Sequence, residues 1–290
     1  MKSIIFLCLF ATSFLSYSQS NTVKLTRAYI SLKEYKKKYN KPLTANDSLN
    51  FLIKNNDTLV LLKDYEKPKG TSVTYIPKDS IFLRHYSYSA FRLKDIDSLD
   101  KQQKMYYWKQ PIKIYFAENI SKSVKKDFLK FASDISNPID SLSIQKVNKI
   151  EDSNFVIFSN EDYNFEPRIK ENGTDYYISW NGNNQIYKGA VKINKTLFFN
   201  DILFLNALKE YFLRSLGHFN LSKYLDCNSY FSNCYSKDKT FSSMDKELLK
   251  YHYSYGICKG TDYETFMNQH KRAKEVLEKT GRKMNFIHPY

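Results

Sequence analysis

The residues with the clearest capacity for chemistry stand together in the stretch 206–218. It holds the carboxylate of Glu210, the phenol of Tyr211 and the guanidinium of Arg214, and it ends in a glycine followed by His218. On a helix, two ligands four residues apart can hold a metal ion beside a carboxylate that activates its water. Arginine stays protonated and tyrosine is no base at neutral pH. The stretch therefore has the layout of an active-site helix without the groups that would carry out its chemistry.

Glu210 and Arg214 can instead pair with each other across one helical turn, so that an ion pair would replace a metal site. A second arrangement stays open, because His218 and His252 could meet after the helix. With Asp226 or Glu210 they would form an unorthodox metal site. Histidines beside aromatic residues are more often packed or exposed than metal-bound. We therefore expect no catalytic residue, no metal and no other cofactor, and we treat His218, His252 and Asp226 as candidate binding residues.

Three cysteines follow the stretch, at Cys227, Cys234 and Cys258. In an oxidising compartment we expect one pair to form a disulfide and the third thiol to stay free. Cys227 with Cys234 would close a short loop, whereas either pairing with Cys258 would tie that loop to the following helix, and the sequence does not choose. A zinc site of three thiolates is an alternative, but no C-x-x-C pair is present.

The elements that must position these residues can be read from apolar periodicity. We expect a long helix with Asp201 as its N-cap and Gly217 as its closing residue. Its apolar stripe consists of Leu205, Leu208, Phe212 and Leu216. Before it, the pattern predicts strands at 112–116, 143–147, 154–158, 176–180 and 188–193. A helix capped by Ser121 or Ser123 follows the first of these strands, and Asn137-Pro138 ends it.

Two further helices are expected behind the central one. Ser242 with Asp245 has the form of a capping box, and the helix that it begins runs on to Tyr253. The last helix is expected at 262–280, with Thr261 as its cap and a glycine at its end. The whole order predicts an α+β fold, in which a mixed sheet packs on the central helix and C-terminal helices close the domain.

This order of elements resembles the zincin metalloproteases, and in particular a bacterial family of unassigned function, related to matrixins and metzincins, whose zinc helix has lost its histidines. The resemblance extends from about Trp108 to the C-terminus. Aligned on Leu216-Gly217, the zincin motif falls on Glu210 and Arg214 at the histidine positions, on Tyr211 at the glutamate and on Asn220 at the third ligand. Ser229-Tyr230-Phe231 stands where the turn beneath the metal would have Ser-x-Met. The resemblance implies the zincin fold with a degenerate motif.

The N-terminal part is organised differently. Residues 1–18 have a lysine, a short apolar run and a small-residue ending, which predicts a signal peptide cleaved near Ser18 and a secreted or periplasmic protein. Residues 19–105 are expected to form a small β-rich region, with strands at 58–62, 72–76 and 80–91 and a possible helix at 32–39. The zincin-like domain would then occupy 106–290. No later segment is apolar enough to predict a membrane span.

A tripeptide of Asp, Ser or Thr, and an aliphatic residue recurs through the chain and resembles an acceptor pattern for O-glycosylation. It begins at Asp47, Asp57, Asp79, Asp97 and Asp140. The alternative is that these residues are simply common in turns that lead into strands.

The amino-acid composition limits the classes of binding partner that we expect. The chain carries 45 basic and 30 acidic residues, a formal charge of +15, in scattered positions. For an exported protein this favours a solvated surface or anionic polymers over nucleic acid. Three hypotheses follow: a non-catalytic zincin-like protein that binds a peptide, protein or glycan in the former substrate cleft, an active secreted metalloprotease with non-standard zinc ligands, and an envelope structural protein that binds anionic polymers.

Overall fold

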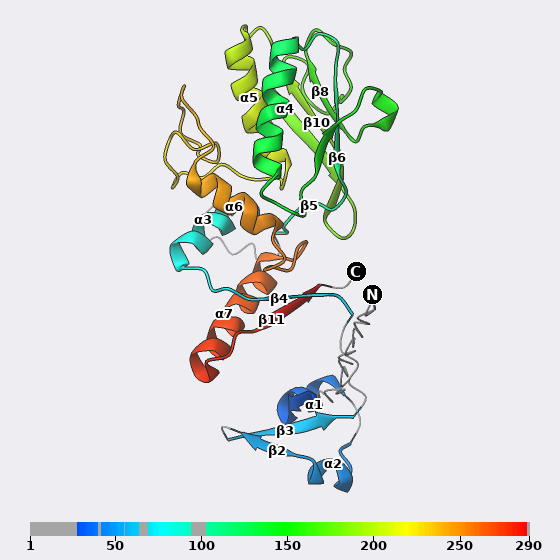
Figure 1. Ribbon diagram of the computed structural model, residues 1–290, viewed down its shortest axis with the longest axis vertical. Helices are drawn as coiled ribbons and strands as arrows, with labels where there is room; N and C mark the ends of the chain where they lie inside the picture. The colour runs from blue at the N-terminus through cyan, green and yellow to red at the C-terminus, as the bar shows by residue number, and fades with distance from the viewer. Residues whose placement is uncertain (1–27, 40–41, 55, 64–68, 94–102, 289–290) are drawn as a thin grey trace, which may run out of the picture. The chain divides into compact units, whose positions relative to one another are not determined.

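The computed structural model describes residues 28–39, 42–54, 56–63, 69–93 and 103–288. The expected signal peptide, residues 1–18, and the tripeptide at Asp97 lie outside these ranges. Contacts divide the chain into two compact units, residues 1–68 and 69–290. Both helices and sheets are present, so the protein has a mixed α+β architecture (Figure 1).

The first unit is a three-stranded antiparallel sheet with two short helices. Its strand order is β1-β3-β2. The elements are β1 (Ala28–Ser31), α1 (Leu32–Lys38), α2 (Ala45–Leu49), β2 (Leu52–Lys54) and β3 (Asp57–Leu62). The expected strand at 58–62 and the helix within 32–39 are both confirmed. Among the described residues of this unit only Val60 is fully buried.

The second unit begins well before the boundary expected at residue 106. Strand β4 (Thr71–Thr74) pairs antiparallel with β11 (Asn285–His288) at the other end of the chain. Residues 80–91, expected as a strand, form the helix α3 (Ser80–Ala90) instead. Asp79 caps it by accepting a hydrogen bond from the backbone N–H of Phe82. The aromatic residues that favoured a strand lie at helical spacing and pack on the C-terminal helices, so tertiary contacts override β-propensity here.

The main sheet has the order β5-β10-β8-β6-β7, and β9 pairs with β10 away from this path. Its strands are β5 (Tyr107–Trp108), β6 (Ile112–Phe116), β7 (Ile144–Lys146), β8 (Phe155–Ser159), β9 (Asp175–Trp180) and β10 (Gln185–Ile193). All pairings are parallel except that of β9 with β10. Each strand expected from the sequence between residues 112 and 193 is present.

Two long helices, α4 (Lys122–Ser136) and α5 (Asp201–Ser215), lie together against the sheet (Figure 1). Ser121 caps α4, which resolves the choice between Ser121 and Ser123. Asn200, not Asp201, is the N-cap of α5, because its side chain accepts a hydrogen bond from the N–H of Leu203. The Phe212 ring of α5 packs edge-on against Phe128 of α4 and Phe155 of β8. This contact fixes α5 on the sheet.

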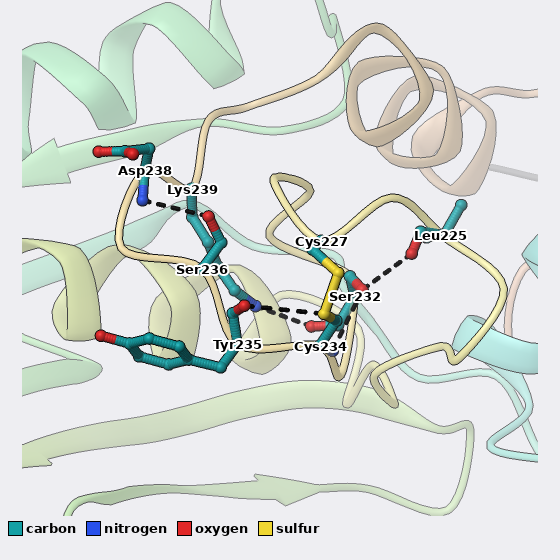
Figure 2. The surroundings of a disulfide bond; sticks show 8 residues. All are labelled: Leu225, Cys227, Ser232, Cys234, Tyr235, Ser236, Asp238 and Lys239. Carbon is teal, nitrogen blue, oxygen red and sulfur yellow. Dashed lines mark hydrogen bonds between the residues drawn. A yellow bond between two sulfur atoms is a disulfide. The ribbon is translucent and has the colours of Figure 1, made fainter.

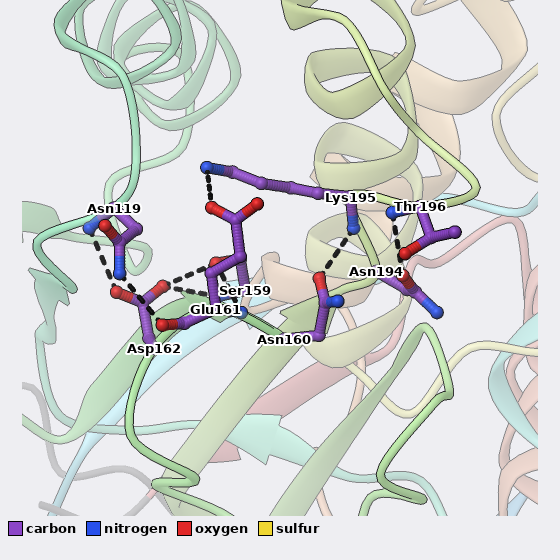
Figure 3. A network of polar contacts seen from close by, with 8 residues as sticks. All are labelled: Asn119, Ser159, Asn160, Glu161, Asp162, Asn194, Lys195 and Thr196. Carbon is purple, nitrogen blue, oxygen red and sulfur yellow. Dashed lines mark hydrogen bonds and ion pairs between the residues drawn. The ribbon is translucent and has the colours of Figure 1, made fainter.

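At the carboxyl ends of the parallel strands the loops are tied to one another (Figure 3). Asp162 accepts hydrogen bonds from the backbone N–H groups of Asn119 and Ser159. Lys195, after β10, forms an ion pair with Glu161 at 2.6 Å. Ligands of α/β sheets often bind at such an edge, but here these polar groups are engaged in contacts with one another.

The C-terminal part consists of α6 (Ser243–Tyr253) and α7 (Tyr263–Thr280). The expected capping box of Ser242 and Asp245 is confirmed. Helix α7 is capped by Asp262 rather than Thr261, since the Asp262 carboxylate accepts the N–H of Thr265 at 2.7 Å. Gly281 closes α7 in the left-handed conformation, with φ 65°.

Candidate functional site

Three of the predicted motif positions, Glu210, Tyr211 and Arg214, lie on the second half of α5, and Asn220 follows the helix. Their side chains do not share one partner. The guanidinium carbon of Arg214 lies 5.2 Å from the ring centre of Tyr176 on β9 and 5.3 Å from that of Tyr211. The two tyrosines hold the cation by cation–π contact. Arg214 Nε is buried, and among the described residues it has no hydrogen-bond partner. A buried donor of this kind is costly, and a ligand acceptor would relieve that cost.

Glu210 is engaged elsewhere. Its carboxylate pairs with Lys239 at 3.3 Å, and among the described residues the expected pair with Arg214 is not formed. Lys239 Nζ also donates to the carbonyl oxygen of Ser232 at 2.7 Å. A residue that the sequence placed outside the motif therefore neutralises Glu210, because the loop after α5 folds back over the helix.

That loop is closed by the disulfide Cys227–Cys234, one of the three pairings left open by the sequence (Figure 2). Cys258 is free and half-buried. Tyr235 and Lys239 follow the disulfide and line a cavity of about 240 Å³ together with Glu210. The disulfide loop thus forms one wall beside the predicted motif positions.

His218 has a backbone conformation that the sequence did not indicate. Gly217 was expected to close α5, but the left-handed residue is His218, with φ 53°. Gly217 is required for a different reason: a Cβ there would lie 2.5 Å from the Phe219 ring. The histidine Nδ1 lies 2.9 Å from the hydroxyl of Tyr176. Burial, aided by the charges of Arg92 and Arg214, lowers the pKa of His218 to about 4, so the imidazole is neutral at pH 7.

The other candidate binding residues have surroundings that differ from those of His218. His252 is fully buried, with Nδ1 3.1 Å from the Tyr86 hydroxyl and Nε2 2.8 Å from the carbonyl oxygen of Tyr106. Burial lowers its pKa to about 3. Asp226 is exposed. Across the described ranges, no three His, Cys, Asp or Glu side chains come together in a group that could hold a metal ion.

Asn220, the position of the third zincin ligand, is held by a hydrogen bond of its backbone. Its N–H donates to the carbonyl oxygen of Ser89 at the end of α3, with a distance of 2.9 Å. The motif positions therefore face three environments: the disulfide loop for Glu210, the tyrosines of β9 and α5 for Arg214, and α3 for Asn220.

Around Tyr211, Arg214 and His218 the structure gathers three residues that the sequence analysis did not single out as site residues, Tyr106, Tyr176 and Trp180. We call these six residues together the aromatic–arginine cluster. Trp180 lies 4.4 Å from Tyr106 between ring centres and is 41% exposed. The alternation of residues 176, 178 and 180 on one strand was the available signal, because such residues share one face.

The cluster lies beside a sheet edge. Within the described residues β9 has a strand partner on one side only, β10. No second strand of the described part of the chain pairs with β9 on its other side, and an edge of this kind is the feature that an added strand uses. An open edge, a desolvated arginine and aromatic faces together suit binding of an extended chain.

Searches against known proteins give no further guide. No protein-family model matches the chain, and no curated protein matches it in sequence. Within the part of the chain described, no helix combines the length and apolarity needed to cross a bilayer.

Proposed function

We propose that this protein is an exported, non-catalytic zincin-like protein that binds an extended peptide along β9, with an acidic side chain of the peptide on Arg214. The observation that carries the proposal is the position of Arg214. Within the part of the chain that the structure describes, its buried Nε has no hydrogen-bond partner, and the adjacent strand β9 is paired on one side only.

The zincin-like part of the proposal is supported by the order of elements. Strand β6, helix α4, strands β7, β8, β9 and β10 and helix α5 follow one another as the resemblance implies. The single antiparallel strand, β9, is the one that contacts α5 from the edge of the sheet. A binding role is supported by the motif positions, where Glu210 is paired with Lys239 and Arg214 stacks on tyrosines.

Peptide binding is favoured by the chemistry of the edge. Main-chain hydrogen bonds to β9 would supply affinity for any extended segment, and alternate side chains would supply selectivity. Tyr176 and Trp180 point to the same face of β9, so a neighbouring strand would set alternate residues beside them. A carboxylate on that face would meet the Arg214 guanidinium, a charge-assisted contact of the strong kind.

The proposal is tested by isothermal titration with a blocked hexapeptide of alternating threonine and valine that carries one central glutamate. We expect the glutamine counterpart to bind about tenfold more weakly, since a hydrogen bond to a charged group is lost. A peptide with N-methyl groups on alternate residues should not bind, because it cannot pair with a strand edge. The Arg214→Met variant should bind the glutamate peptide and the glutamine peptide with equal affinity.

Glu166→Gln/Arg168→Met is the matched control, because Arg168 pairs with the buried Glu166 at 2.6 Å and removing the arginine alone would leave that carboxylate unpaired. The Arg168 guanidinium also stacks on a β9 tyrosine, Tyr177, at 3.7 Å, but Tyr177 points to the opposite face from Tyr176. This variant should bind as the wild type does. Equal affinity for the N-methylated peptide would refute edge pairing, and chelator-sensitive cleavage of the peptide with one bound zinc would overturn the non-catalytic assignment.

A further inference from the structure

A cavity of about 800 Å³ opens in the second unit, and none of the aromatic–arginine cluster lines it. Its walls come from the segment 107–111, the turn between β9 and β10, and the segment 255–260. Polar side chains predominate at its rim, among them Asn183 and Gln185, and the rings of Tyr107 and Tyr255 face it.

Lys259 is the unusual residue of this cavity. Its Nζ donates to the Ser141 hydroxyl at 2.9 Å and lies 4.9 Å from the ring centre of Tyr255, 5.6 Å from that of Tyr253 and 5.9 Å from that of Tyr107. An ammonium group has three N–H donors. Among the described residues only Ser141 accepts from it, and no carboxylate forms an ion pair with it.

A partly buried ammonium without an anion is energetically unfavourable. Burial lowers the pKa of Lys259 to about 8, so the group is still mostly protonated at pH 7. The protein thus keeps a positive charge on the wall of a cavity where three tyrosines, rather than an acid, surround it. An anionic group of a ligand would supply the missing partner.

The segment that carries Lys259 is held in place. Gly260 adopts φ 77°, and a Cβ there would lie 2.8 Å from the carbonyl oxygen of Asn183. Asn184 Nδ2 donates to the carbonyl oxygen of Gly260 at 2.7 Å. The lysine is therefore fixed against the β9–β10 turn before any ligand arrives, which lowers the entropic cost of binding.

We propose that this cavity binds an acidic saccharide, whose carboxylate pairs with Lys259 and whose sugar ring packs on Tyr255. The apolar C–H face of a pyranose suits a tyrosine ring, and its hydroxyls suit the side-chain amide of Asn183, which lines the cavity. Tyr255 is 44% exposed, so the ring is accessible. The exposed carboxyl of Asp140 lies on the same wall, which favours a ligand with spaced single charges over a dense polyanion.

The test is a calorimetric titration of the full chain with trigalacturonate and with maltotriose, a neutral trisaccharide. We expect the acidic probe to bind at least about tenfold more tightly than the neutral one. Lys259→Met, which keeps the apolar stem, should lose that preference. Tyr255→Ala removes an exposed ring and should weaken binding about tenfold while the fold is kept.

Lys126→Met is the control for net charge, because Lys126 is an exposed residue of α4 away from the cavity. It should bind trigalacturonate as the wild type does. If Lys126→Met and Lys259→Met lost the same affinity for trigalacturonate, the probe would be attracted only by the overall positive charge of the protein. That result would refute the site. No binding of trigalacturonate by the wild type, or equal binding of maltotriose, would also overturn the proposal.

Discussion

The Nδ1 atom of His218 lies 2.9 Å from the hydroxyl oxygen of Tyr176, and this contact joins the end of α5 to the edge strand β9. Both groups are neutral at pH 7, because burial lowers the pKa of the histidine to about 4 and raises that of the tyrosine to about 12. The contact places a histidine from the segment after the central helix in a packed, uncharged setting.

Acid should destabilise the protein through this and two other histidines. Burial lowers the pKa of His252 to about 3 and that of His270 to about 4, as it does for His218. Below about pH 6.5 these histidines bind protons in the unfolded chain but stay neutral in the native state. The native state therefore loses stability as the pH falls toward 4. Each histidine should lower the free energy of unfolding by roughly 2 kcal/mol between pH 7 and 5. Urea unfolding at both pH values measures the difference.

The matched variant is His218→Asn, since asparagine tolerates the left-handed backbone that His218 adopts. Between pH 7 and 5 the free energy of unfolding should fall less in this variant than in the wild type. The difference should equal the contribution of the His218 imidazole. An unchanged pH dependence in the variant would show that His218 does not titrate as described.

Gly217→Ala should destabilise the protein, although alanine usually favours helices. The new Cβ would lie 2.5 Å from the ring of Phe219, which is only 2% exposed and cannot move freely. Overpacking of this kind costs about 1–3 kcal/mol. Gly182→Ala is the control, because a Cβ there meets no atom within 4 Å. Equal midpoints of thermal unfolding for the two variants would contradict the close contact.

Reduction of the disulfide should weaken the loop over α5. Cys227 and Cys234 have a sequence separation of 7. Closing so short a loop stabilises a protein by about 2 kcal/mol. Chemical unfolding with and without a reductant should show this difference. Cys258→Ser should respond to the reductant as the wild type does, since Cys258 is unpaired. A Cys227→Ser/Cys234→Ser variant as stable as the oxidised wild type would refute the effect.

Arg214→Met should separate binding from stability. The variant loses cation–π contacts with Tyr176 and Tyr211, worth about 1 kcal/mol. It also removes a buried donor for which the described residues supply no acceptor. We therefore expect a change in unfolding free energy within about 1 kcal/mol. If the free energy of unfolding fell by more than about 2 kcal/mol, Arg214 would instead have a mainly structural role.

The sequence by itself determined most local elements. Apolar residues at helical spacing, such as Val124 and Phe128, predicted α4, and the capping box of Ser242 and Asp245 predicted the start of α6. The strands of the main sheet from β6 to β10 were equally readable, whereas the short strand β5 was not expected. These signals act over a few residues, so no knowledge of distant partners is needed to interpret them.

Only the tertiary structure decided which residues meet. It made 80–90 a helix, paired β4 with β11, chose Cys234 as the partner of Cys227 and gave Glu210 a lysine from a distant loop. It also brought Ser141 to Lys259 across more than a hundred residues of chain. Such contacts depend on how separate elements pack. The spacing of apolar residues in the sequence shows which face of a strand or helix is buried, but it does not show which other element packs against that face.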